Sequence, residues 1–398
     1  MRKKSALLAG LGAAVFLLWI LWGCGPRNME GSRKDIVQSA AEGIHSQAKE
    51  WNDLKPIRRM ELQYANQFSV DYYEDDYKVI HIKEVGGFLV VPEGGSVPVG
   101  LPEEIAVIRQ PLRNIYLTAT SAMDLFRSLE AVDRITLSGT DAGGWYIEEA
   151  KERLKEGRML YAGKYNAPDY EMILSEGCDL AIESTMIYHS PEVKEQLERL
   201  GIPVLVERSS YESHPLGRME WIKLYGALLD REDAAEAEFE DQMKGLQEMA
   251  GQQETGKKVA FFYISSNGYV NVRKSGDYVA KMIEMAGGAY VPQNGSSNGN
   301  ALSTMNMQME DFYLEGRDAD YIIYNSTIDG GMESLDQLLE KNGLLSDFKA
   351  VKEGNVWCTE KNLFQETMGL GRMILDIHKI LTEEEPDPGE IVYMHRLR

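Results

Sequence analysis

The sequence has only three cysteines and six histidines in 398 residues. Apart from Cys24, the cysteines Cys178 and Cys358 lie 180 positions apart, which excludes a disulfide framework and a cysteine-based metal motif. We expect both to pack as small apolar residues. No close metal-ligand spacing occurs among the histidines, which are His45, His81, His189, His214, His378 and His395. The sequence therefore predicts no motif for a resident metal ion.

Catalytic signatures are missing as well. The chain has no Gly-rich phosphate loop ending in Lys-Ser or Lys-Thr, no His-Glu-x-x-His pair and no Gly-x-Ser-x-Gly elbow. These absences favour binding over catalysis, and we expect neither enzyme activity nor a cofactor. Basic residues are also in deficit, 42 against 63 acidic ones, for a net charge of −21. Such a surface repels nucleic acid, so we expect no nucleic-acid partner and interpret the acidity as solvated surface.

The N-terminus has the pattern of an export signal. A basic start at Arg2–Lys4 is followed by the uncharged apolar run Ser5–Trp22, then by Gly23 and Cys24. This pattern predicts a lipoprotein signal peptide over residues 1–23 and a lipid on the Cys24 thiol. The alternative is an uncleaved transmembrane anchor, because Trp22 is bulky for this position and eighteen apolar residues nearly span a bilayer. Both interpretations place the remaining chain outside the cytoplasm, and the first anchors it to the cell membrane by lipid.

Behind the signal, about 370 residues exceed what one compact core usually holds, which predicts two domains. Residues 24–66 are interpreted as a tether followed by a helical segment. Over residues 67–110, alternating β-branched and aromatic runs are separated by Glu74-Asp75-Asp76 and Gly86-Gly87. These runs and turns predict a small antiparallel β meander.

From residue 111 onward, short apolar runs alternate with helical patterns, which is typical of parallel sheets flanked by helices. We assign residues 111–229 to an N-terminal lobe and residues 253–398, where the rhythm restarts, to a C-terminal lobe. Between them, residues 230–252 carry apolar residues at helical spacing and predict one long helix. The expected fold class is therefore α/β, with two lobes joined by an interlobe helix.

An internal echo supports duplication of the lobes. Glu171 precedes an Asp179-started strand that ends in Ser184-Thr185. Glu310 likewise precedes an Asp320-started strand that ends in Ser326-Thr327.

Polar and aromatic residues gather where the predicted strands end. Open α/β sheets bind ligands in the loops beyond the carboxyl ends of their strands. For each residue alone the alternative is ordinary capping or turn chemistry. As a group they are our candidates for a ligand site: Thr120, Ser121, Trp145, Thr185, Tyr188, His189, Tyr211, His214, Arg218, Asn267, Arg273, Asn325 and Phe364.

Five stretches in order resemble the ABC-importer binding proteins for iron-siderophores, haem and cobalamin. They are residues 171–182, 200–206, 221–239, 283–288 and 347–356. The resemblance covers residues 111–398 and leaves the meander outside. It implies two α/β lobes around a stiff helix, with a shallow cleft between them.

The resemblance further implies an extracytoplasmic lipoprotein that delivers a small-molecule metal chelate, of iron-siderophore or haem type, to an ABC permease and ATPase pair. A cobalamin-binding protein of the same importer class is the alternative, as is a cell-envelope sensor or enzyme using the same cleft. In the resembled family, one glutamate per lobe meets permease arginines, and Glu171 and Glu310 match these positions.

Residue types at the expected cleft suit such a chelate. Tyr165 lies near where the resembled haem binders place an iron-ligating tyrosine, and His189 and His214 are other candidates. Arginine and lysine bind carboxylates and catecholates, while aromatic rings stack on planar ligands. The first set is Lys164, Arg218 and Arg273, and the second is Trp145, Tyr188 and Tyr211.

Overall fold

The computed structural model describes residues 49–247, 254–293, 304–328 and 330–398. The predicted signal peptide and Cys24 lie outside them. The chain divides into Met1–Gln47 and Ala48–Arg398, and the second unit holds every element discussed below. Within the described part of this unit, no helix combines the length and apolarity needed to cross a bilayer.

The N-terminal sheet has the order β1-β2-β3-β4-β5. Alternating burial along β2, with Phe68, Val70 and Tyr72 inward, turns one face of the sheet to the core. The expected antiparallel arrangement holds for β1 to β4, but the fifth strand pairs parallel to β4. The strands are β1 (Pro56–Arg59), β2 (Phe68–Tyr73), β3 (Lys78–Ile82), β4 (Gly86–Val91) and β5 (Ile105–Arg109).

The prediction of a helical segment before the sheet is wrong over its described part. Residues 49–66 contain a short 3-10 turn, Trp51–Asp53, and the strand β1. The segment after β1 is fixed instead by side chains of the following lobe. The buried carboxylates of Glu220 and Glu212 accept hydrogen bonds from the backbone N–H groups of residues 63–67.

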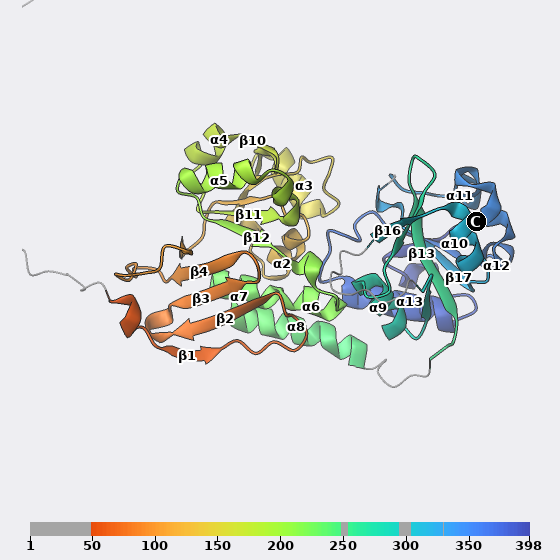
Figure 1. Cartoon of the computed structure of the whole chain (residues 1–398), viewed down its shortest axis with the longest axis horizontal. Coiled ribbons are helices and arrows are strands. Elements are labelled where there is room, and N and C mark those ends of the chain that lie inside the picture. The colour runs from red at the N-terminus through yellow and green to blue at the C-terminus, as the bar shows by residue number, and fades with distance from the viewer. Residues whose placement is uncertain (1–48, 248–253, 294–303, 329) are drawn as a thin grey trace, which may run out of the picture. The chain divides into compact units, whose positions relative to one another are not determined.

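The next sheet is entirely parallel, in the order β12-β11-β6-β7-β8. All its strands except the edge strand β8 are buried on both faces, because helices cover both (Figure 1). Tyr116, for example, faces the cluster with α4 and α5, whereas its neighbours Ile115 and Leu117 face the large central core. The strands are β6 (Ile115–Leu117), β7 (Ile135–Ser138), β8 (Leu160–Tyr161), β11 (Leu180–Ser184) and β12 (Val204–Glu207). The helices are α2 (Ala122–Ser128), α3 (Glu148–Lys155), α4 (Tyr170–Ser175) and α5 (Pro191–Arg199).

The last sheet has the expected parallel centre, and its edges are antiparallel. Strands β15, β13, β17 and β18 pair in parallel, while β14, β16 and β19 run antiparallel. Helices α10 to α12 cover one face and α9 and α13 the other (Figure 1). The strands are β13 (Lys258–Ile264), β14 (Val270–Arg273), β15 (Ala289–Val291), β16 (Thr304–Met307), β17 (Tyr321–Tyr324), β18 (Val356–Thr359) and β19 (Met394–Arg396). The helices are α9 (Tyr278–Met285), α10 (Met309–Gly316), α11 (Leu335–Lys341), α12 (Lys349–Lys352) and α13 (Leu370–Thr382).

Three helices, α6 (Pro215–Glu220), α7 (Ile222–Leu229) and α8 (Glu232–Gln247), lie between the two sheets in the sequence. Ala235, Phe239 and Leu246 are buried on α8, as the helical spacing predicts. Helices α7 and α8 approach each other closely at Gly226, since a Cβ on this residue would lie 2.7 Å from the Cβ of Ala235. The last predicted residues of the helix, 248–252, lie outside the described residues. The role of α8 as the connector of the lobes stays a prediction.

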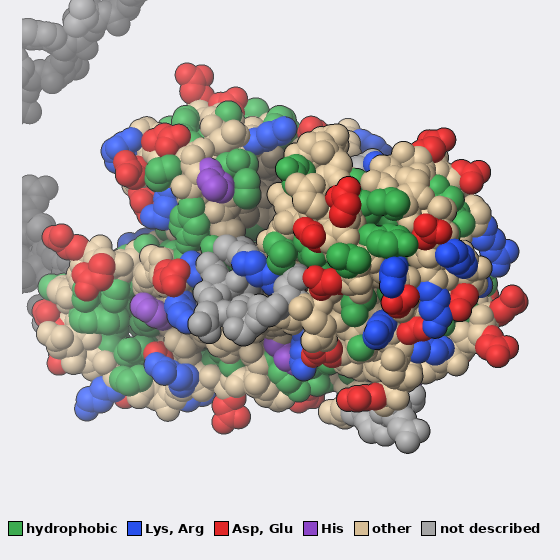
Figure 2. Space-filling view, turned by 45° about the vertical axis from the view of Figure 1, so that its right-hand side comes forward, with side chains coloured by type: hydrophobic (Ala, Val, Ile, Leu, Met, Phe, Trp, Pro, Cys, Tyr) green, Lys and Arg blue, Asp and Glu red, His purple; other side chains and the backbone are tan. Residues whose placement is uncertain are grey.

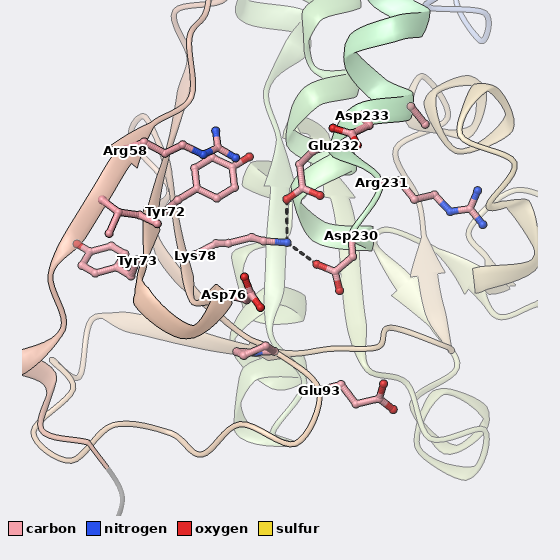
Figure 3. A pocket seen from close by; sticks show the side chains of 13 residues that line it. Arg58, Tyr72, Tyr73, Asp76, Lys78, Glu93, Asp230, Arg231, Glu232 and Asp233 are labelled. Atoms are coloured by element: carbon pink, nitrogen blue, oxygen red, sulfur yellow. Dashed lines mark hydrogen bonds and ion pairs between the residues drawn. The ribbon is translucent and has the colours of Figure 1, made fainter.

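The N-terminal sheet packs on α7 and its neighbours through aromatic and charged contacts. Phe68 meets Trp221 edge-on, with ring centroids 5.0 Å apart. At the other end of the same face, where Tyr72 and Lys78 lie, a cavity of about 760 Å³ opens beside the junction of α7 and α8. Figure 3 shows Lys78 reaching from β3 toward the carboxylates of Asp230 and Glu232, with which it forms ion pairs. The Lys78 ammonium is almost fully buried. The cavity therefore lies beside the ion pairs that attach the sheet to the junction of α7 and α8.

Candidate functional site

Two buried carboxylates organise the loops at the carboxyl edge of the parallel sheet. Glu183, near the end of β11, accepts a hydrogen bond from the Thr118 hydroxyl. Burial raises the pKa of Glu183 to about 7, although this hydrogen bond opposes the shift. Glu207, which ends β12, accepts from Ser121 Oγ at 3.3 Å and from the Ser209 N–H at 2.7 Å. Glu207 thus joins the loops after β6 and β12, and burial raises its pKa as well.

Beside them stands a buried arginine that the sequence interpretation missed. Arg208 follows β12 directly and its side chain is 3% exposed. Its guanidinium lies over the Tyr211 ring, 4.0 Å from the centroid, and Nη1 donates to the Tyr188 hydroxyl at 3.5 Å. Nη2 lies 3.0 Å from Oε2 of Glu84 in the turn between β3 and β4. The predicted Tyr188 and Tyr211 are therefore brought together, around a cation not predicted. Its position directly after a buried strand was the available signal.

A second cluster gathers predicted residues from both sheets around Tyr278. The Arg218 guanidinium on α6 lies 3.6 Å from the Tyr278 ring centroid. Arg273, at the end of β14, lies 5.8 Å from the same centroid and 5.4 Å from that of Phe364. Arg218 also donates through Nη2 to the Ser210 carbonyl at 2.9 Å, which places it next to the Arg208 loop. Tyr278 itself was not predicted, because nothing in its helical surroundings distinguishes it from a core residue.

Loops of the two α/β regions touch through the segment after β18. The Gln365 side chain accepts from the Tyr146 N–H at 2.7 Å and donates to the Gly144 carbonyl at 2.8 Å. Thr367 donates through its hydroxyl to the Ser121 carbonyl at 2.8 Å. Phe364 is therefore held next to the loops after β6 and β7, where Thr120 and Ser121 lie.

Two predicted site residues prove to be satisfied within the protein. Trp145 is 0% exposed, and its Nε1 donates to Ser138 Oγ and to the Thr140 carbonyl, each at 3.1 Å. It packs in the core and offers no ring face to a ligand in this structure. His214 caps α6, because its Nδ1 accepts from the Leu216 N–H at 3.2 Å. Burial lowers the pKa of His214, and its ring stacks on Tyr64.

The other candidates are distributed over several loops. Lys164 and Tyr165 lie on the hairpin of β9 (Gly163–Lys164) and β10 (Ala167–Pro168), which follows β8 at the edge of the sheet opposite β12. Thr185 and His189 bound the 3-10 turn after β11. Asn267 is exposed in the turn after β13, where its Oδ1 accepts from Ser265. The remaining candidate, Asn325, is buried and accepts from Thr327, as in ordinary turn chemistry.

The internal echo has a structural counterpart. Asp179 accepts a hydrogen bond from the Asn114 N–H at the entrance of β6, and Asp320 accepts from the Lys258 N–H at the start of β13. Glu171 and Glu310 are exposed in the first turns of α4 and α10. Each is followed on its helix by an exposed leucine, namely Leu174 and Leu314.

Charge on the surface is mixed. Figure 2 shows acidic and basic side chains interspersed over the visible face of the described residues. Within the same ranges of the chain, no three histidine, cysteine, aspartate or glutamate side chains are grouped so that they would hold a metal ion.

Comparisons with known proteins agree with this architecture. The sequence model of the family described as "Periplasmic binding protein" matches residues 121–363, more than half of the chain. An uncharacterized lipoprotein of Methanocaldococcus jannaschii is 25% identical over 359 residues, which cover 81% of this chain and 82% of that protein.

Among solved structures, a periplasmic haem-binding protein from Pseudomonas aeruginosa superposes with a TM-score of 0.56 at 16% identity, over 72% of this chain and 99% of that one. The periplasmic catecholate-siderophore-binding protein VctP from Vibrio cholerae superposes with a TM-score of 0.52 at 17% identity, over 67% and 93%. The matched family segment begins after the N-terminal sheet, so β1 to β5 lie outside it.

Proposed function

Because the chain belongs to the periplasmic binding protein family, whose members bind solutes rather than transform them, we propose which solute it carries. It is an extracytoplasmic lipoprotein, anchored through Cys24, that captures a metal chelate of the iron-siderophore or haem type. It passes this chelate to an ABC permease and ATPase pair. The observation that supports the ligand class is the convergence of Arg208, Arg218 and Arg273 with aromatic rings at the loops beyond the strands.

The chemistry of these groups favours an anionic, partly planar ligand. Guanidinium groups bind carboxylates and catecholates through two parallel hydrogen bonds, and they stay charged at every physiological pH. A buried guanidinium without a full set of partners is costly, so an anion that completes the set gains affinity. Arg208 and Arg218 each keep a buried Nε without a hydrogen-bond partner among the described residues. Ferric siderophores and haem carry such anionic groups next to conjugated rings.

The structural comparisons support the same class without fixing the ligand. The superposed haem-binding and catecholate-siderophore-binding proteins share the fold at identities of 16% and 17%. A corrinoid would use the aromatic walls and leave the arginines unused, which makes it the weaker candidate.

Binding of defined ligands tests the proposal. We expect a ferric catecholate or haemin, titrated into the protein by calorimetry or tryptophan fluorescence, to bind at micromolar concentration or below. Replacement of one anion-binding arginine by alanine in Arg218→Ala should weaken binding by about tenfold or more, because a charge-assisted hydrogen bond is worth roughly 1.5–3 kcal/mol. Arg199→Ala, at an exposed position on α5, is the matched control. Preferential binding of cyanocobalamin, or no binding of any ferric chelate, would contradict the proposal.

A further inference from the structure

We propose that the turn between β3 and β4 belongs to the ligand site, and that the Glu84 carboxylate occupies Arg208 until an anionic group of the ligand displaces it. This inference rests on the proposed function, because it concerns the same loops. It assigns a task to the N-terminal sheet, which lies outside the matched family segment.

The first observation is the unequal exposure of the two partners. The Arg208 side chain is 3% exposed, whereas the Glu84 side chain is 68% exposed. The carboxylate thus reaches an otherwise buried cation from the solvent side. Solvated carboxylates exchange readily with water and other anions, since an ion pair with an exposed partner contributes little net energy. An incoming anion can therefore replace Glu84 at small cost.

The second observation is spare hydrogen-bonding capacity on Arg208. A guanidinium has five N–H donors in a planar fork. Nη2 meets Glu84 and Nη1 meets the Tyr188 hydroxyl at 3.5 Å, but Nε is buried without a hydrogen-bond partner among the described residues. Stacking on Tyr211 holds the plane of the fork. Glu84 supplies a single contact to the Arg208 guanidinium. An anion with two suitably spaced oxygens could instead form two hydrogen bonds with it.

The third observation is the backbone at Glu84. Its φ is 61°, a left-handed conformation that glycine and asparagine adopt with less strain than glutamate. The Val85 N–H donates to the Ile82 carbonyl at 3.0 Å and closes this turn. Glycine at this position would relieve the backbone strain. Glutamate keeps the strain, but it places a carboxylate beside Arg208. Strained backbone of this kind gathers at functional sites.

The ion pair of Glu84 and Arg208 is not needed to attach the N-terminal sheet to the lobe. The carboxylates of Glu212 and Glu220 already hold five consecutive backbone N–H groups of residues 63–67. The Lys78 ammonium pairs with two carboxylates, those of Asp230 and Glu232, at the junction of α7 and α8. The Glu84 contact therefore adds little to the attachment, and its effect is expected on ligand binding.

The chemistry of the cluster specifies the group that is bound. The guanidinium of Arg208, the hydroxyl of the half-exposed Tyr188 and the Tyr211 ring suit a planar anionic group such as an aromatic carboxylate, a catecholate or a haem propionate. A neutral ligand would not displace Glu84 from Arg208. The site therefore selects anionic chelates over neutral ones.

Three purified proteins test the inference: the wild type, Glu84→Gln and Arg208→Gln. The probes are ferric tris(2,3-dihydroxybenzoate), haemin and free 2,3-dihydroxybenzoate, each titrated by calorimetry, with thermal unfolding measured in parallel. Removal of the competing carboxylate in Glu84→Gln should tighten binding of the anionic probe about fivefold. Loss of the cation in Arg208→Gln should weaken it about tenfold, which corresponds to about 1.4 kcal/mol. Glu103→Gln, an exposed site in the same sheet region, should change nothing.

The outcomes separate this inference from the proposed function. If a ferric chelate binds but Glu84→Gln leaves its affinity unchanged, the inference is overturned while the proposed function stands. The inference also fails if Glu84→Gln lowers only the melting temperature, because the ion pair then stabilises the fold without affecting ligand binding. If ferric chelates do not bind but free 2,3-dihydroxybenzoate does, with the expected order of the variants, the inference stands and the proposed function fails. If no probe binds any of the proteins, both are overturned.

Discussion

The two α/β regions share a frame and differ in the loops that the frame supports. In both, an exposed glutamate starts a helix, and an aspartate at the next strand fixes the neighbouring strand through its N–H. Directly before the shared Ser-Thr pair, however, one region has the buried acid Glu183 and the other has the amide Asn325. Arg208 pairs with Glu84 of the N-terminal sheet, whereas Arg273 ends the strand β14 in the sheet of its own region. We infer that the repeated features serve a partner and the divergent ones the ligand.

The largest expected effect comes from breaking the repeated feature in both regions. Glu171→Arg combined with Glu310→Arg should abolish uptake, because the reversed charges would repel the permease arginines that the family resemblance implies. Ligand affinity should stay unchanged, since both side chains are exposed and neither is among the residues that form the two arginine clusters.

Transport assays in the native host and calorimetry on the purified double variant give the two readouts. Glu195→Arg with Glu340→Arg, at exposed positions on α5 and α11, is the charge-matched control and should transport normally. Normal uptake by the Glu171 and Glu310 double variant would remove the docking role from these residues.

The next effect sharpens the contrast between Glu183 and Asn325. Burial raises the pKa of Glu183 from the ordinary 4.5 to about 7. The folded state then keeps a proton that the unfolded state has already released, so stability falls as the pH rises from 4.5 through 7. Between pH 5 and 8 the loss should be about 2–3 kcal/mol, at about 1.4 kcal/mol for each pH unit of this window.

Glu183→Gln should remove this contribution, because an amide does not titrate, and should make this region resemble the one with Asn325. Urea unfolding of the wild type and the variant at pH 5 and pH 8 measures it. Glu192→Gln, exposed on α5, controls for the general loss of charge. An equal fall in stability with pH for wild type and Glu183→Gln would refute the assignment of the proton.

A smaller effect is expected from alanine substitutions at two glycines, Gly226 on α7 and Gly245 on α8. In Gly226→Ala the new methyl would lie 2.7 Å from the Ala235 Cβ, so α7 and α8 must move apart. Overpacking of this kind costs about 1–3 kcal/mol. In Gly245→Ala the nearest atom lies at 3.7 Å, and the better helix propensity of alanine should stabilise the protein by up to about 1 kcal/mol. Denaturant midpoints of opposite sign are expected, and equal shifts would disprove the tight contact.

The buried strands could be predicted from the sequence because each is a short, continuous apolar run between turns. The runs at 179–182, 203–206 and 321–324 match β11, β12 and β17 to within two residues. Pairing at the sheet edges could not be predicted for β16 and β19, since each pairs with a strand more than 30 positions away in the sequence. The helical expectation for 49–66 failed because side chains from α6 and its preceding loop, not local propensity, fix that segment.

The site was predictable as a set of loops but not as a set of contacts. Arg218, Arg273 and Phe364 meet around Tyr278, as the rule for strand ends suggests. Trp145 is buried because Ser138 and Thr140 satisfy its indole N–H, which depends on tertiary packing. Arg208 follows a buried strand directly, which was the available local signal, but its partner Glu84 lies 124 positions earlier in the chain, so the ion pair could not be predicted.

The most direct test of the central claim is the identity of the ligand that the protein carries in its own host. Protein purified gently from that host should show visible absorption, and its native mass spectrum should contain a complex that loses an iron chelate or haem on denaturation. Arg208→Gln and Arg218→Ala purified alongside should carry less of it. A colourless protein that carries a metal-free solute, or a corrinoid retained equally by both variants, would contradict the account.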